Sequence, residues 1–105
     1  MGDEGIGVVA RMPQLRELDL YGTLITDRAL DYLEGLAHLE HLNISDTDVT
    51  DAGLMKLRGP ESLALLEVTL GEGLTAEEVD ALKVHLPGCT VRCWRRDPIT
   101  GILYR

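Results

Sequence analysis

The feature that most constrains this chain is an internal repeat. The stretch LRELDLYGTLITDRAL at 15–30 aligns with LEHLNISDTDVTDAGL at 39–54, at an offset of 24 residues. The same pattern reaches backward to Asp3 and forward to Val91 and Cys93, with one extra residue in the stretch GEGL. A chain with a fixed period of this length folds as stacked copies of one unit, each burying its apolar face against the next.

Each unit is predicted to hold a short strand followed by a helix. Leu18-Asp19-Leu20 alternates apolar and polar residues, which is the pattern of a strand with one buried face. Leu30 and Leu33 then recur at helical spacing. The sequence therefore predicts alternating strands and helices, beginning with a helix at about 3–11.

Threonines mark the helix starts. Thr75 and Glu78 form a capping box, in which the threonine side chain and the glutamate each bond a free backbone N–H. By alignment Thr26 and Thr50 are also N-caps. The aspartate after each of these threonines then lies at the first helical position, where its charge meets the positive end of the helix dipole.

The repeated pattern L-x-x-L-x-L-x-x-T-x-[IV]-T-D resembles the leucine-rich repeat, in the form of about 24 residues common in bacterial proteins, and the resemblance covers about residues 3–94. It implies an α/β fold, a right-handed solenoid with a short parallel sheet on its concave face and helices on its convex face. We expect a single domain, 1–105. Its parts are an N-terminal half-repeat helix at 1–14, repeats at 15–38, 39–62 and 63–88, and a C-terminal cap hairpin at 89–105.

The two ends of the stack differ. The turn signature Asp97–Gly101 predicts a hairpin whose last strand, Ile102–Tyr104, covers the edge of the sheet. At the other end no strand precedes the first helix, so the strand at 16–21 has an open edge. We expect this chain to be the C-terminal part of a longer protein that extends upstream of Met1. The alternative is that another chain pairs with the open edge.

Charge and composition exclude several classes of function. The net charge of −8 disfavours nucleic acid, whose phosphates would be repelled. The sequence has no apolar run of membrane-spanning length and no signal peptide, so we expect a soluble, cytoplasmic chain without a membrane partner. The charge is uneven, because residues 89–105 carry a net +3 and residues 1–88 the remaining −11.

No motif indicates catalysis, a cofactor or a metal. The acidic stretch DTDVTDAGL at 46–54 fails as an EF-hand loop, because Asp51 and Leu57 stand where that loop needs Gly and Glu. Cys89 and Cys93 lie too far apart along a strand for a disulfide, so we expect two reduced, buried thiols. We therefore predict that the chain is not an enzyme.

The predicted solenoid assigns a binding surface instead, because strand residues between the leucines point onto the concave face. The candidate partner-binding residues are Glu17, Asp19, Tyr21, His41, Asn43, Ser45, Glu67, Thr69, Arg92 and Trp94. The acids among them are either a site for a basic partner or a plain solvated face. Trp94 is either an interface anchor or packs against the hairpin cap, with Tyr104 as a candidate neighbour.

Two functions remain open on the sequence alone. The first is a non-catalytic protein–protein interaction module, or scaffold, whose concave face binds another protein of basic or mixed charge. The second is a structural role in which copies self-associate through the open N-terminal sheet edge or through their oppositely charged ends. The sequence assigns no role to Asp46 and Asp48, because Gly22 and Leu24 stand at these places in the previous unit.

Overall fold

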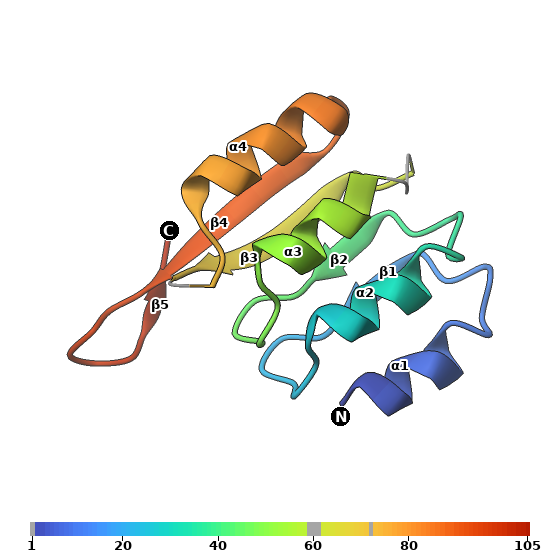
Figure 1. The fold of residues 1–105 in the computed structure, drawn as a ribbon, viewed down its shortest axis with the longest axis horizontal. Coiled ribbons are helices and arrows are strands. Elements are labelled where there is room, and N and C mark those ends of the chain that lie inside the picture. The colour runs from blue at the N-terminus through green and yellow to red at the C-terminus, as the bar shows by residue number, and fades with distance from the viewer. Residues whose placement is uncertain (1, 59–61, 72) are drawn as a thin grey trace.

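The computed structural model describes residues 2–58, 62–71 and 73–105 (Figure 1). The elements in chain order are α1 Asp3–Val9, β1 Glu17–Asp19, α2 Asp27–Leu33, β2 His41–Asn43, α3 Asp51–Leu54, the 3-10 helix η1 Met55–Arg58, β3 Leu65–Leu70, α4 Ala76–His85, β4 Thr90–Arg96 and β5 Leu103–Tyr104. The predicted alternation of strands and helices is confirmed. The first helix ends at Val9, two residues earlier than the sequence pattern indicated.

The strands form one five-stranded sheet in the order β1-β2-β3-β4-β5. The first four strands are parallel, and Leu18, Leu42, Leu66 and Val91 lie side by side in register. This register reproduces the spacing of the sequence repeat, because each unit contributes its strand at the same point of its length. The extra residue of the third unit falls within 71–74, where Glu72 lies outside the described residues.

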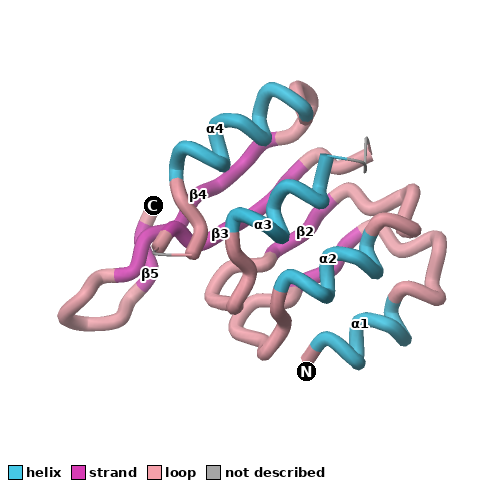
Figure 2. The backbone as a smooth tube through the Cα atoms, in the orientation of Figure 1, coloured by secondary structure: helices cyan, strands magenta, loops and turns pink. Residues whose placement is uncertain are grey.

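The helices cover one face of the sheet, as Figures 1 and 2 show. A layer of aliphatic side chains lies between helices and strands, and one buried position of each helix faces this layer: Ile6, Leu30, Leu54 and Val79. The sequence contains no Phe, so leucine, isoleucine and valine supply almost all of this core. The fold is thus α/β with a mostly parallel sheet.

A ladder of aspartate–threonine pairs joins consecutive units, and the sequence did not predict it. The pairs are Asp3–Thr26, Asp27–Thr50 and Asp51–Thr75. In each pair the threonine donates its backbone N–H to one carboxylate oxygen over 2.7–2.8 Å and its hydroxyl to the other. The aspartates do lie at the first helical positions, as predicted, but each carboxylate also binds the start of the next unit.

The threonine caps are confirmed in position, with one correction. Thr26 and Thr75 accept hydrogen bonds from backbone N–H groups of their own helices, at 3.3 and 3.4 Å. Thr50 stands at the N-cap of α3 without such a bond, so the hydrogen bond from its hydroxyl to Asp27, at 2.5 Å, has no capping bond beside it. The local sequence predicted that the Thr50 side chain caps its own helix. In the structure this side chain binds the previous unit.

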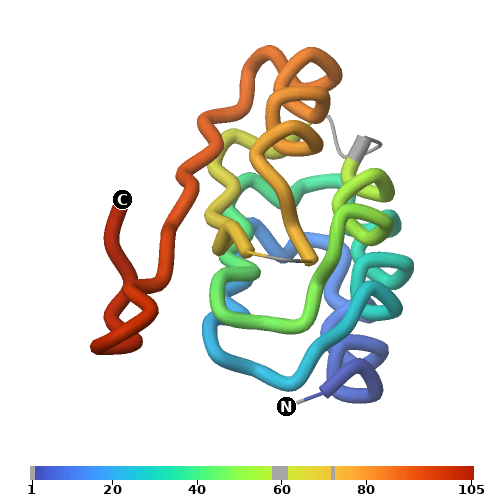
Figure 3. The backbone as a smooth tube through the Cα atoms, turned by 60° about the vertical axis from the view of Figure 1, so that its left-hand side comes forward, coloured from blue at the N-terminus to red at the C-terminus, as the bar shows by residue number. Residues whose placement is uncertain are grey.

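The C-terminal hairpin is present, but its last strand is shorter than predicted. β5 pairs only with the last two residues of β4, Arg95 and Arg96. The carboxylate of Asp97 accepts the backbone N–H groups of Ile99 and Thr100, at 2.7 and 2.9 Å, and so forms the turn. On the side away from β3, the rest of β4 has no strand beside it among the residues that the structure describes. Figure 3 shows the hairpin on the side of the sheet away from the helices.

The structure gives Asp46 a role that the sequence could not assign. Its backbone is left-handed (φ 55°), as is that of Gly22 (φ 69°) at the same place in the previous unit. Its carboxylate forms an ion pair with Arg96, which also donates to the carbonyl of Gly101 at 2.7 Å. Asp46 therefore attaches the hairpin to the turn after β2, fifty positions away along the chain.

At the N-terminal end β1 is the edge of the sheet, with no strand beyond it in the described part of the chain. Met1 lies outside the described residues. Within those residues no helix is long and apolar enough to cross a membrane.

Candidate functional site

The sheet face that carries no helix, here called the open sheet face, holds the predicted partner-binding residues. Along β1 to β4 they alternate with the aliphatic residues that pack against the helices, so they point the opposite way. Glu17, Asp19, Tyr21, His41 and Arg92 are exposed, Asn43, Glu67, Thr69 and Trp94 are half-buried, and Ser45 is buried.

The three predicted acids of this face lie around one shallow hollow. Glu17, Asp19 and Glu67 border a space of about 160 Å³ that is also lined by His41. Nδ1 of His41 lies 3.4 Å from Oε1 of Glu17. A guanidinium nitrogen of Arg92 lies 3.8 Å from Oε1 of Glu67. With neutral histidine, the hollow and its rim carry three carboxylates against one guanidinium, so the local charge is negative.

Several polar side chains on this face also hold the ends of the strands. A carboxylate oxygen of Asp19 accepts the backbone N–H of Tyr21 at 3.0 Å, and the side-chain oxygen of Asn43 accepts that of Ser45 at 2.9 Å. The hydroxyl of Thr69 accepts the backbone N–H of Asp46 at 2.9 Å. These bonds fix the strand ends and orient the side chains.

A larger cavity, of about 250 Å³, lies where the hairpin meets the open sheet face. Its lining residues are Tyr21, Asn43, Ser45, Glu67, Trp94 and Leu103. Ser45 is 1% exposed, and its hydroxyl has no hydrogen-bond partner among the described residues. The indole N–H of Trp94 donates to Oε1 of Glu67 at 3.4 Å.

The hairpin contributes residues that the sequence interpretation missed. Leu103 lines the same cavity as Trp94, and the guanidinium carbon of Arg105 lies 6.0 Å from the centre of the Trp94 ring. Trp94 therefore lies beside these two residues of the hairpin end, and Tyr104 lines a separate hollow. The basic character of residues 89–105 was the available signal, since that segment lies against an otherwise acidic chain.

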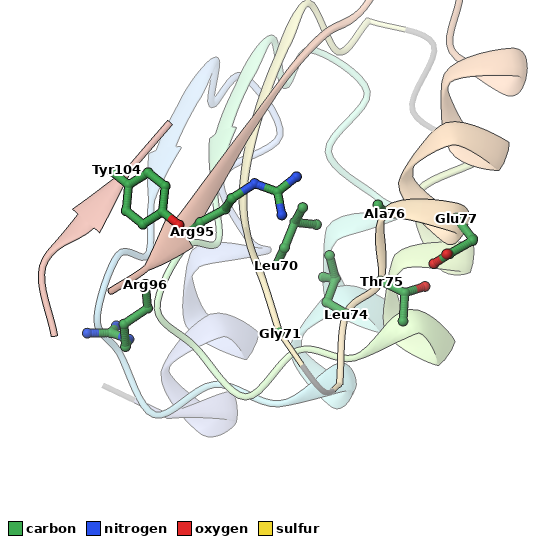
Figure 4. Close-up of a pocket in the computed structure, with 9 residues that line it drawn as sticks. All are labelled: Leu70, Gly71, Leu74, Thr75, Ala76, Glu77, Arg95, Arg96 and Tyr104. Carbon is green, nitrogen blue, oxygen red and sulfur yellow. The ribbon is translucent and has the colours of Figure 1, made fainter. Parts of the chain in front are cut away.

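That separate hollow, of about 420 Å³, lies at the start of α4 (Figure 4). Arg95 extends towards Ala76, while Arg96 points the other way. Arg95 follows Trp94 directly in β4, so the two side chains point to opposite faces of the sheet. The hollow therefore does not belong to the open sheet face.

The described residues show no group of three histidine, cysteine or carboxylate side chains that could hold a metal ion. Cys89 and Cys93 are free thiols, and each is half-buried, whereas the sequence predicted full burial. Burial raises the pKa of both thiols above the usual cysteine value, which keeps them protonated and poorly nucleophilic at neutral pH.

Comparison with known proteins agrees with the repeat. The family described as Leucine Rich repeat matches residues 35–57, the stretch that runs from the end of the first repeat through β2 and α3. The match supports the leucine-rich repeat family for this chain, and domains of this family generally mediate protein–protein interaction rather than catalysis. No curated protein matches the chain.

Proposed function

We propose that this chain is a non-catalytic interaction module that binds a basic segment of another protein on its open sheet face, the concave face of a leucine-rich repeat solenoid. One observation carries the proposal. Glu17 and Asp19 from β1 and Glu67 from β3 line the same hollow. A parallel sheet is rigid, so these carboxylates are already placed before binding, and little conformational entropy is lost when a partner arrives.

The partner's chemistry follows from the charges of this face. Asp19 is exposed and lies in the hollow without an ion pair among the described residues, while Glu17 faces His41 rather than a lysine or an arginine. Lysine and arginine side chains would complement these carboxylates and speed encounter with the acidic chain. Because the site is exposed, we expect binding that weakens as salt concentration rises.

The test neutralises the face and compares it with an equal change elsewhere. The face variant carries Glu17→Gln, Asp19→Asn and Glu67→Gln. The control variant carries Glu4→Gln, Glu34→Gln and Glu77→Gln, at exposed positions on the helices or at their ends. Both variants change the net charge from −8 to −5, because each loses three carboxylates.

The probe is a fluorescein-labelled arginine-rich peptide, followed by fluorescence anisotropy at low and physiological salt. Exposed ion pairs contribute about 0.2–1 kcal/mol each, so three of them predict roughly tenfold weaker binding for the face variant. We expect the control variant to bind nearly as well as the original chain. Equal weakening of both variants would mean that only net charge matters, and would refute the assignment to this face.

Self-association is our second candidate. It rests on β1, which is the free edge of the sheet in the described part of the chain. This strand spans only three residues, with exposed acids at both ends, and such short charged edges resist pairing with another sheet. Light scattering at high protein concentration and low salt tests it: a monomer under those conditions eliminates the candidate.

A further inference from the structure

The cavity between the hairpin and the open sheet face has the composition of a binding pocket for one side chain. Tyr21, Trp94 and Leu103 supply apolar walls, and Glu67 supplies a carboxylate. Its volume of about 250 Å³ lies below the roughly 300–1,000 Å³ of pockets for drug-sized molecules. The cavity therefore suits a single amino-acid side chain better than a cofactor.

Ser45 is the observation that points to a ligand. Ser45 lines the cavity and is 1% exposed, and its buried hydroxyl has no hydrogen-bond partner among the described residues. Buried polar groups are nearly always paired, because an unpaired one loses its bonds to water and gains nothing in return. A ligand that brings a hydrogen-bond donor into the cavity would satisfy this hydroxyl once the Ser45 side chain turns towards it.

Two contacts indicate which donor fits. The indole ring of Trp94 already lies near a guanidinium, that of Arg105, at 6.0 Å from the ring centre. Oε1 of Glu67 accepts the indole N–H and faces Arg92, which leaves Oε2 to accept from an incoming group. A planar guanidinium has five N–H donors and stacks on aromatic rings, so one group can meet the ring, the carboxylate and the hydroxyl together.

We propose that this cavity receives an arginine side chain of the bound partner, with Trp94, Glu67 and Ser45 as its contacts. The inference rests on the proposed function, and it names the residue type that anchors the partner. Leu103 lines the cavity and Arg105 lies two residues further along, next to the same indole. Arg105 thus places a like charge beside the incoming guanidinium, competes for the ring and weakens binding.

Trp94 is the only tryptophan of the chain, so tryptophan fluorescence comes from a residue that lines this cavity. The first measurement titrates the chain with a blocked Gly-Arg-Gly peptide, and with the same peptide carrying citrulline, the uncharged analogue of arginine. We expect saturable quenching by the arginine peptide and at least tenfold weaker binding of the citrulline peptide. Equal responses to both peptides would overturn the proposal.

Variants then separate the cavity from the rest of the face. Ser45→Ala removes the unpaired hydroxyl, and we expect about threefold to tenfold weaker binding of the arginine peptide. Ser62→Ala is the matched control, because that hydroxyl donates to the carbonyl of Leu39 at 2.7 Å, away from the cavity. It should leave peptide binding unchanged. Arg105→Gln should tighten binding twofold or more, and no change in that variant would overturn the competing role of Arg105.

The two levels of the proposal fail differently. If the labelled arginine-rich peptide binds and the face variant weakens it, while Trp94 fluorescence and Ser45→Ala show no response, the cavity inference is wrong and the open-face function stands. If the peptide does not bind at all, both are wrong. If Ser45→Ala lowers affinity without loss of folded structure, and Ser62→Ala does not, the cavity is supported.

Discussion

The central pair of the aspartate–threonine ladder joins α2 to the start of α3. Asp27 accepts the backbone N–H of Thr50 at 2.7 Å and its hydroxyl at 2.5 Å. The change Asp27→Ala removes both acceptors and leaves a partly buried N–H and hydroxyl unpaired at the start of α3. The two units then lose both hydrogen bonds between the Asp27 side chain and Thr50.

The expected loss follows from the geometry. Hydrogen bonds to a charged group contribute about 1.5–3 kcal/mol each, so two predict about 3–6 kcal/mol. Thr50 and Asp27 are only half-buried, and water can replace part of what is lost. We therefore expect a decrease of about 2–4 kcal/mol in the free energy of unfolding, a large share of the 5–15 kcal/mol typical of a domain.

Urea unfolding measures this loss, with Asp31→Ala as the control. Asp31 is in the same helix, and its variant also loses a carboxylate. Its ion-pair partner is Lys56 at 2.9 Å. Asp31 is exposed and Lys56 half-buried, so loss of this largely solvated pair costs about 1 kcal/mol. A double-mutant cycle of Asp27→Ala with Thr50→Val should give a coupling free energy of about 0.5–3 kcal/mol. Equal losses at Asp27 and Asp31, or zero coupling, would refute the ladder.

Two further predictions concern the same ladder. Gly53→Ala should destabilise the chain by about 1–3 kcal/mol despite the better helix propensity of alanine, because the added Cβ would lie 2.2 Å from a carboxylate oxygen of Asp27. Gly35→Ala, which meets nothing within 4 Å, is its control in urea unfolding, and equal effects would contradict the clash. The hydrogen bonds from Thr26 hold the pKa of Asp3 below its usual value, so the stability that Asp3 contributes is present above about pH 4 and is lost as pH falls through its folded pKa. The stability difference between the original chain and Asp3→Asn should therefore shrink in acid, and a difference that does not change with pH would refute this linkage.

The repeat, the strand register and the core were predictable because they depend on side chains read one unit at a time. Leu18, Leu42 and Leu66 recur at one spacing. Each can pack into the core only if its strand lies beside the previous one in the same register. The hairpin was predictable from its turn residues. Its position over the open sheet face was not, because it depends on an ion pair between Arg96 and Asp46, from distant parts of the chain.

The candidate site divides in the same way. Alternation along the strands placed Glu17, Asp19 and Trp94 on the face without helices, and the structure agrees. It could not show that Ser45 is buried, or that Leu103 closes a cavity above it. Neither fact is a property of a strand pattern, since both depend on the size and direction of side chains from separate units.

By itself, then, the sequence determined the period, the aliphatic core and the charge of the open sheet face. Apolar burial is non-directional, and a regular spacing of leucines is enough to specify it. Only the tertiary structure decided the partners of the polar groups: Asp27 with Thr50, Arg96 with Asp46, and no partner among the described residues for the hydroxyl of Ser45. Hydrogen bonds require specific distances and angles, which exist only once residues far apart in the chain have been brought together.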